Sequence, residues 1–342
     1  MFHIGQDGWL FLTVGTNRAA DLYADTPEVW RMLRGWRRLL LARADRAARL
    51  DARYLHLSSP EKLSVYDHKF FGPGPVRASR SPTRRLGQLL RLSPKGRRLW
   101  VDALAPLRAG RDAAELYYRT DTHWTSQGTF VAYRAICAAC GAAPIADLLE
   151  TRPAHTATRR MDLGEKLQFP VTETSTYRAI RRTAWVAEAG RLYGLAEAHP
   201  ELALHTGVRV GFRNGDPAAD PRSLLVFGSS YSGYGGLGLT SMLAETFRRV
   251  DFVWSAEVDW GLVAKLRPVI LLTESAERYM ARLPDDDRFD VGRYEDEKLA
   301  GLLAENPGLA IPRAFSDEVE TGSSEKMRQN KDLESFAIAT RS

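Results

Sequence analysis

A histidine lies two residues after an aspartate in the stretch “LYYRTDTHWTSQGTF” (residues 116–130), just ahead of a helical pattern. Imidazole is the commonest general base of enzymes, and a carboxylate bonded to one ring nitrogen fixes the tautomer that leaves the other nitrogen basic. In an extended segment Asp121 and His123 project to the same side of the chain, so direct contact is easy. We therefore interpret the pair as the acid–base half of a hydrolytic site; the alternative is a strand end with polar residues.

A serine follows a buried strand pattern in “LLVFGSSYSGYGG” (residues 224–236). The apolar run ending at Phe227 is typical of a strand covered on both faces, and the glycines after it favour a tight turn at the carboxyl edge of the sheet. Ser230 is the candidate nucleophile there. A serine hydroxyl needs an adjacent base, for which His123 is the candidate. A helix beginning beyond the glycines would point backbone N–H groups at an oxyanion.

Other chemistries fit these residues less well. “GYGGLG” (233–238) suggests a phosphate cradle, but it lacks a P-loop lysine and the spacing of a dinucleotide fingerprint. An Asp-x-His pair also suits a metal, which would need further ligands at matching spacings. The remaining histidines are scattered along the chain: His3, His56, His68, His155, His199 and His205. We predict no metal site and no cofactor, only an acyl donor that the sequence does not identify.

Charge and hydropathy restrict the partners. The net charge is +6 and the pI is about 9.3, mostly from arginine spread along the chain. Basic clusters at 31–38 and 93–98 come without a recognition motif, so no nucleic-acid partner is predicted. An acidic polymer of uronic acids would suit the same charge. No window approaches the roughly 18 apolar residues of a membrane helix. “MFHIGQDGWLFLTVG” does not resemble a signal peptide, which is compatible with a cytoplasmic protein.

The two cysteines, Cys137 and Cys140, lie three residues apart at the end of an apolar helical pattern, before Gly141. A redox pair normally begins a helix that follows a strand. We therefore expect both to be small packing residues.

Periodicity predicts apolar strands alternating with helices, which implies a mostly parallel sheet with helices on both sides. A hairpin is expected in “IGQDGWLFLTV” (4–14), whose D-G pair favours a turn. Strands are expected over 53–59, 114–120, 223–227, 250–255 and 267–275, and helices over 27–50, from 82, over 126–141 and over 239–248. Thr26 and Thr125 or Ser126 are expected N-caps.

The same patterns suggest the domain boundaries. Residues 1–284 read as one α/β domain that contains an irregular, lid-like insertion at about 142–207. Hydrophobicity falls after Pro284, so the extension 285–342 is expected to be largely disordered.

Five blocks of the sequence, in order, resemble the SGNH-hydrolase-like family of the alginate O-acetylation proteins AlgJ and AlgX. They extend over roughly residues 5–284: “GQDGWLFL” (5–12), “SSPEKLSVY” (58–66), “YYRTDTHWTSQG” (117–128), “VFGSSYS” (226–232) and “ESAERYM” (274–280). Two positions depart from the family pattern. Ser229 stands where Asp or Thr is usual, and Thr125-Ser126 replaces Asn-Pro.

The resemblance implies an SGNH-type three-layer α/β/α sandwich with a mostly parallel central sheet and a permuted block order, in which the Asp/His block precedes the serine block. Carried over by position, Ser230 matches the nucleophile, His123 the base and Asp121 the orienting acid. For the oxyanion hole, only the Ser230 backbone N–H is assigned. The resemblance also implies a periplasmic protein with a membrane O-acyltransferase partner.

The expected activity is transfer of an acyl group, acetyl by resemblance, through an acyl-serine to a polysaccharide hydroxyl in exopolysaccharide biosynthesis. The acceptor needs a groove in which aromatic rings contact sugar faces and arginine binds carboxylates. The candidate lining residues are Tyr118, Arg119, Trp124, Tyr231, Arg278 and Tyr279. Two alternatives remain open: a carbohydrate acetyl-esterase with the same triad, and a non-catalytic polysaccharide-binding or assembly protein.

Overall fold

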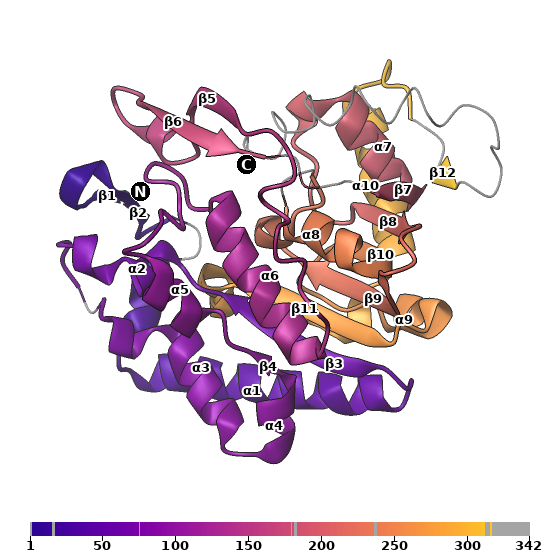
Figure 1. Cartoon of the computed structure of the whole chain (residues 1–342), viewed down its shortest axis with the longest axis horizontal. Coiled ribbons are helices and arrows are strands. Elements are labelled where there is room, and N and C mark those ends of the chain that lie inside the picture. Colours follow the sequence, from indigo (N-terminus) through magenta and orange to yellow (C-terminus); the bar gives the residue numbers. More distant parts are fainter. Residues whose placement is uncertain are drawn as a thin grey trace. The chain divides into compact units, whose positions relative to one another are not determined.

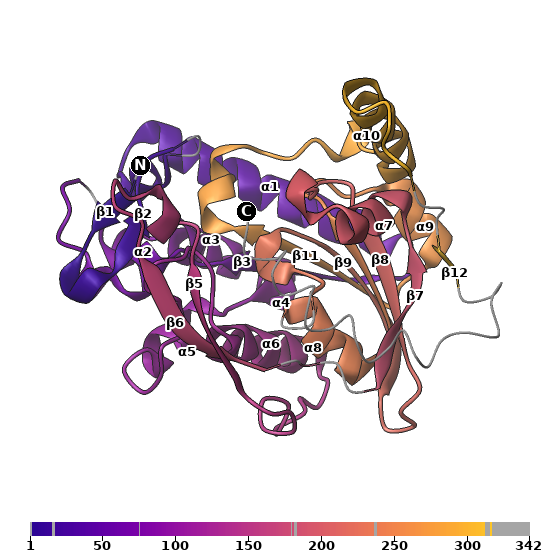
Figure 2. The same cartoon turned by 90° about the horizontal axis from the view of Figure 1, so that it is seen from above.

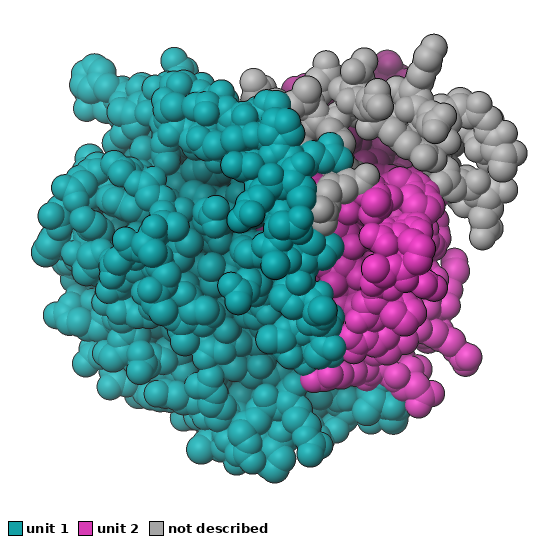
Figure 3. All heavy atoms as spheres, viewed as in Figure 1, with its two compact units in different colours: residues 1–49, 54–178, 274–283 teal, residues 50–53, 179–273, 284–342 magenta. Residues whose placement is uncertain are grey.

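The chain is described here by a computed structural model covering residues 2–15, 18–74, 76–178, 180, 183–235, 238–311 and 315–316. It divides into two compact units (Figure 3). Unit 1 comprises residues 1–49, 54–178 and 274–283, and unit 2 comprises residues 50–53, 179–273 and 284–342. The expected domain 1–284 therefore contributes residues to both units.

Unit 1 begins with the expected hairpin. Strands β1 (Phe2–Ile4) and β2 (Leu10–Leu12) pair antiparallel, with Phe2 opposite Leu12. The connection needs left-handed backbone at Asp7 (φ 55°) and Gly8 (φ 77°), conformations that aspartate and glycine adopt more readily than most residues.

The long helix α1 (Pro27–Ala48) packs against α3 (Pro82–Arg91) and α4 (Pro94–Leu99) in unit 1 (Figure 1). Its start is confirmed: the Thr26 hydroxyl accepts from the Val29 N–H at 3.4 Å. The side chains it buries recur at helical spacing: Val29, Leu33, Trp36, Leu40 and Ala47. The burial of this stripe stabilises the helix more than propensity does.

Unit 1 contains further helices and strands. They are β3 (Arg53–Ser59, whose first residue belongs to unit 2), α2 (Lys62–Val65), β4 (Trp100–Val101), α5 (Leu104–Gly110) and α6 (Ser126–Cys140). β3 and β4 pair in parallel. The Thr125 hydroxyl caps α6 by accepting from the Gly128 N–H at 3.3 Å, as expected. Cys137 and Cys140 are buried in α6, which agrees with a packing role.

Two sequence predictions in unit 1 differ from the structure. Residues 114–120 form no strand; a single bridge pairs Tyr117 with Trp124. The segment read as irregular contains an antiparallel ribbon of β5 (His155–Arg160) and β6 (Thr172–Tyr177). The polar, threonine-rich composition of these residues is also common in loops. Threonine is β-branched, however, and β-branched residues that alternate along the chain favour strands.

Unit 2 is built on a sheet whose order is β12–β7–β8–β10–β9–β11. The bounds are β7 (Ala184–Ala189), β8 (Arg209–Asn214), β9 (Asp220–Gly228), β10 (Phe247–Trp254), β11 (Ile270–Ala276) and β12 (Phe315–Ser316). β9 pairs in parallel with both β10 and β11, and the outer strands β8, β7 and β12 add antiparallel pairs. β11 continues into unit 1 at Glu274.

The crossover helices of unit 2 cover both faces of this sheet. α8 (Leu239–Thr246) joins β9 to β10 and packs on β8 and β10; α9 (Trp260–Leu266) joins β10 to β11. Figure 2 shows α8 and α9 on opposite sides of β9. The connection from β9 to β10 and the connection from β10 back to β11 run in opposite directions across the sheet. When both crossovers are right-handed, their helices lie on opposite faces. The expected α/β/α layering around a parallel sheet centre is confirmed.

The end of the described chain also packs on unit 2. Within the extension 285–342, where we expected little regular structure, α10 (Val291–Glu305) forms a helix. Its Leu299 and Leu302 join a core with Leu192 of α7 (Arg191–Ala198). Residues 317–342 lie outside the described residues. Across the described parts of the chain, no helix is both long and apolar enough to cross a bilayer.

Candidate active site

Asp121 and His123 form a hydrogen-bonded pair in unit 1. Asp121 Oδ1 lies 2.7 Å from His123 Nδ1 and also accepts the His123 backbone N–H at 2.8 Å. The expected contact is therefore present, although a bend produces it and not an extended segment. An aspartate that accepts the N–H two residues on forms an Asx turn, which fixes its carboxylate beside the ring. The carboxylate is 3% exposed and the imidazole 19% exposed.

This geometry shifts both pKa values. Burial alone would raise the pKa of Asp121, but the charge of His123 and the hydrogen bonds from His123 and the Asp162 N–H lower it to about 2. Burial would lower the pKa of His123, but the Asp121 carboxylate, with help from Asp162, raises it above 6.5. An ionised aspartate that holds Nδ1–H leaves Nε2 as the basic nitrogen of the neutral ring.

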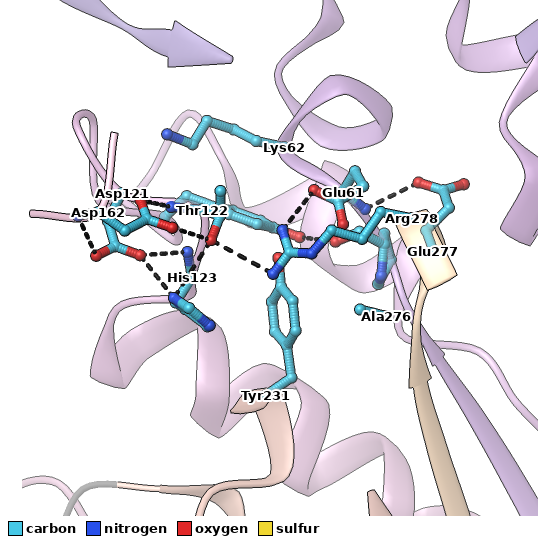
Figure 4. A network of polar contacts seen from close by, with 12 residues as sticks. Glu61, Lys62, Asp121, Thr122, His123, Asp162, Tyr231, Ala276, Glu277 and Arg278 are labelled. Carbon is cyan, nitrogen blue, oxygen red and sulfur yellow. Dashed lines mark hydrogen bonds and ion pairs between the residues drawn. The ribbon is translucent and has the colours of Figure 1, made fainter. Parts of the chain in front are cut away.

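Asp162 is a second carboxylate at this pair, and sequence reasoning missed it. It accepts the Thr122 N–H at 2.9 Å and the Thr122 hydroxyl at 2.6 Å (Figure 4). Asp162 lies 41 residues beyond Asp121, in a segment interpreted as an irregular insertion. No motif around Asp162, and no regular spacing from Asp121 or His123, indicates in the sequence that it belongs to this site.

Arg278 connects the pair to the interior of unit 1. Its guanidinium bonds Glu61 Oε2 at 3.2 Å and donates to the Thr122 hydroxyl at 3.4 Å (Figure 4). Both side chains of the Arg278–Glu61 pair are almost fully buried, at 6% and 3% exposed. Because desolvation offsets the attraction in a buried ion pair, this pair adds little to the free energy of folding. Its structural effect is to hold Arg278 where it bonds the Thr122 hydroxyl.

Lys62 occupies the same region without a direct carboxylate partner among its described contacts. Its ammonium donates to the carbonyl oxygens of Leu10 and Arg119, each at 2.9 Å, and lies 5.5 Å from the centre of the Trp9 ring. Burial lowers the pKa of Lys62 to about 8. The ammonium joins the hairpin strand β2 to the loop that carries Asp121.

The four sequence blocks in unit 1 contact one another through such bonds. Lys62 joins the first, second and third blocks, and the Tyr117 hydroxyl donates to the Pro60 carbonyl at 2.5 Å. The fifth block is joined by Glu277, which accepts the Glu61 N–H at 2.8 Å, and by Arg278. These four blocks are therefore bonded to one another around the Asp121–His123 pair.

The serine block lies in unit 2. Ser230 follows the carboxyl end of β9, the position along the chain that the sequence predicted. Ser230 is half-buried and opens a short 3₁₀ turn over Ser230–Ser232. The Ser229 hydroxyl accepts the Tyr231 N–H at 3.3 Å, and the Ser230 carbonyl accepts the Gly233 N–H at 3.2 Å. Ser229, which replaces the Asp or Thr of related sequences, thus still caps the turn.

The six candidate substrate-binding residues differ in exposure. Trp124 and Arg278 are about 5% exposed, Tyr118 8% and Tyr231 4%. Arg119 is exposed and bonds Glu115, and Tyr279 is 39% exposed with the Arg278 guanidinium 5.4 Å from its ring. Arg119 and Tyr279 are the more accessible members, and the other four are buried.

Asp121, His123 and Asp162 each offer a ligand-type atom, and these atoms lie within 4.8 Å of one another. The His123 nitrogen nearest the carboxylates is already hydrogen-bonded to Asp121. The Lys62 and Arg278 cations are close enough to act on these carboxylates and on the ring, and they oppose a bound cation. Asp121 and His123 are bonded through their side chains, and Asp162 is joined to them through its backbone N–H and through Thr122.

The sheet with a parallel centre and the match to a family model place the chain among the SGNH hydrolase-like proteins. Within this class the chain belongs to the family described as “SGNH hydrolase-like domain, acetyltransferase AlgX”, which matches residues 2–199. Among curated proteins, none matches the chain.

Solved structures share the fold at low sequence identity. The O-acetyltransferase domain of Pseudomonas putida AlgJ is 17% identical, with a TM-score of 0.55 over 86% of this chain and 99% of that one. Bacillus cereus PatB1, solved with a sulfonyl adduct, is 11% identical, with a TM-score of 0.57 over 83% and 96%. A DHHW family protein from Eubacterium siraeum is 13% identical, with a TM-score of 0.53 over 81% and 90%.

Proposed function

We propose that this protein is a serine-dependent O-acetyltransferase that acylates polysaccharide hydroxyls through an acyl-serine intermediate, in exopolysaccharide biosynthesis. The observation that carries the proposal is the 2.7 Å hydrogen bond between Asp121 Oδ1 and His123 Nδ1, in a chain of the AlgX acetyltransferase family. The AlgJ domain described as an O-acetyltransferase supports the same reaction class through its shared fold. The proposed nucleophile is Ser230.

The proposed reaction has two half-reactions with one base. His123 Nε2 takes the proton of the Ser230 hydroxyl while the oxygen attacks the acyl carbon of the donor. The tetrahedral intermediate collapses, and the leaving group departs with the proton from His123. A sugar hydroxyl then gives its proton to His123 and attacks the acyl-serine, and Ser230 regains a proton as the ester product leaves. Asp121 stays ionised throughout and stabilises the imidazolium.

The acceptor decides between transfer and hydrolysis. A sugar bound near attack geometry outcompetes water because its effective concentration is high. We propose an acidic polysaccharide acceptor, consistent with the net charge of +6, and a periplasmic location with a membrane O-acyltransferase supplying acyl groups, as in the family. The exposed Arg119 and Tyr279 are the first residues to test as acceptor contacts.

The function is tested with purified protein, an aryl acetate donor and an oligouronate acceptor. We expect acetyl esters on the oligosaccharide by mass spectrometry, and their absence when Ser230→Ala replaces the parent. Release of free acetate alone, unaffected by the acceptor, would identify an esterase. Glycan binding equal in the parent and in Ser230→Ala, with no ester and no acetate in either, would identify a non-catalytic binding protein.

A further inference from the structure

The Asp121–His123 pair lies in a bend, residues 119–124, that belongs to no helix or strand. A segment outside helices and strands lacks their repeating backbone hydrogen bonds, so its N–H groups need other acceptors. The partners come from the β5–β6 ribbon and the loop between its strands. Glu173 of β6 accepts the Arg119 N–H at 3.0 Å, the Thr120 N–H at 2.7 Å and the Thr120 hydroxyl at 2.7 Å.

The loop after β5 holds the second half of the bend. Asp162 accepts both the N–H and the hydroxyl of Thr122, and its own N–H donates to Asp121 Oδ2 at 3.3 Å. The Thr120 carbonyl accepts the N–H groups of Leu163 and Gly164 at 3.0 and 2.9 Å. A Cβ at Gly164 would lie 2.9 Å from the Val171 carbonyl oxygen and 3.2 Å from Thr120 Cβ, so glycine permits this close approach.

We propose that Asp162 is a positioning residue for the Asp121–His123 pair, and that the β5–β6 ribbon is the support that holds the bend in its reactive shape. The carboxylate fixes the peptide between the two residues from one side, and Arg278 fixes the Thr122 hydroxyl from the other. The inference rests on the proposed function, because it assigns a role toward the same base.

The position of Asp162 also gives it an electrostatic effect. Among the charged groups around His123, Asp121 and Asp162 favour the imidazolium and Arg278 disfavours it. Glu61 also interacts with the His123 charge, and the Lys62 charge acts on both aspartates. Three carboxylates and one guanidinium thus act on one ring, and removal of the Asp162 carboxylate must weaken the base.

The test compares Asp162→Asn with Glu173→Gln, a matched control. Both variants neutralise a carboxylate that holds the same bend, but the hydrogen bonds described for Glu173 go to Arg119 and Thr120. In Asp162→Asn we expect the His123 pKa, followed by imidazole NMR, to fall by about 1 unit. The acid limb of the kcat/KM profile should move with it and kcat should fall about tenfold. Glu173→Gln should loosen the bend and lower kcat, but it should leave the pH midpoints of the His123 titration and of the acid limb unchanged.

Equal His123 midpoints in the parent and in Asp162→Asn would overturn the inference. If Asp162→Asn does not fold, the parent protein gives the answer: the Asp162 carboxyl ¹³C shift should show a step at the His123 midpoint, and a curve without that step would contradict the role. The NMR readout requires no turnover. A protein that shows the His123 shift but transfers no acetyl group would refute the proposed function and leave the positioning role intact.

Discussion

The pair at the candidate site depends on a spacing of two residues. Asp121 uses one oxygen to accept both the backbone N–H and the ring Nδ1–H of His123. The first bond makes the turn, and the turn places the ring for the second. The sequence indicated the contact because an Asp-x-His spacing allows it in several backbone conformations, but it did not indicate which conformation occurs.

Asp121→Asn tests the role of the carboxylate. An amide at this position accepts the backbone N–H but neither stabilises the imidazolium nor imposes the reactive tautomer. We expect kcat to fall roughly 10³- to 10⁴-fold, as in other triads. The raised His123 pKa places the acid limb of the parent at higher pH than an ordinary histidine would, so in this variant the limb should move to lower pH. A variant with parental rate and profile would exclude Asp121 from the mechanism.

Lys62 gives a pH dependence of stability that can be assigned to one side chain. Its pKa falls from 10.5 in the unfolded chain to about 8 in the fold because it is buried. The unfolded state therefore binds more protons between pH 8 and 10.5, and stability rises with pH across that window. The expected slope approaches roughly 1.4 kcal/mol per pH unit and totals on the order of 3 kcal/mol.

Urea unfolding across this window measures the effect. Lys62→Met should lose this part of the slope, and Lys166→Met, which removes an exposed ammonium from the same unit, should keep it. Parallel curves for the parent and Lys62→Met would mean that Lys62 is not desolvated in the fold.

Several short segments of unit 1 depend on one carboxylate, that of Glu277. It accepts hydrogen bonds from five donors: the Tyr23, Ser64 and Ser81 hydroxyls and the Glu61 and Thr83 N–H groups. These donors belong to segments up to 254 residues distant in sequence. These short segments have few backbone hydrogen bonds of their own, so the hydrogen bonds to Glu277 fix their positions relative to one another. The carboxylate is therefore their common anchor.

Glu277→Gln should therefore destabilise unit 1. The amide replaces an acceptor oxygen with an N–H₂ group that faces donors, and buried donors without acceptors cost about 1–3 kcal/mol each. We expect a loss of about 2–4 kcal/mol in the free energy of unfolding, measured by urea titration. Glu150→Gln, at an exposed position of the same unit, is the control and should change little. Equal midpoints for the two variants would contradict the anchor role.

The regular elements differ in how well the sequence predicts them. β9 and α1 follow directly from a buried apolar run and a helical stripe with a capped start. β5 and β6 contain few apolar residues, so their hydrophobic pattern does not predict strands. They form strands through threonines that pair across the ribbon. Thr158 and Thr174, for example, are bonded at 2.7 Å. The strand predicted over 114–120 is wrong because the chain bends over 119–124 and returns, so that Tyr117 pairs with Trp124 in an isolated bridge.

For the whole molecule, residue types and block order predicted the α/β fold, the family and the Asp121–His123 contact. They did not predict Asp162 or Glu173. These residues lie in the ribbon segment, and only the tertiary fold brings them to the bend. Catalytic residues that are close together in the chain can be recognised in a single sequence. Residues that position them by hydrogen bonds from a distant segment cannot, because only the tertiary fold brings them together. The assignment of Ser230 to the same reaction remains a prediction.

The most direct test of that prediction is intact-protein mass spectrometry after incubation with an aryl acetate or with a sulfonyl fluoride, since a PatB1 structure contains a sulfonyl adduct. We predict one covalent adduct per chain, mapped to Ser230 by peptide sequencing, and strongly slowed formation of this adduct in His123→Ala. A protein that stays unmodified, or is modified equally in the parent and in His123→Ala, would contradict the proposed catalytic unit.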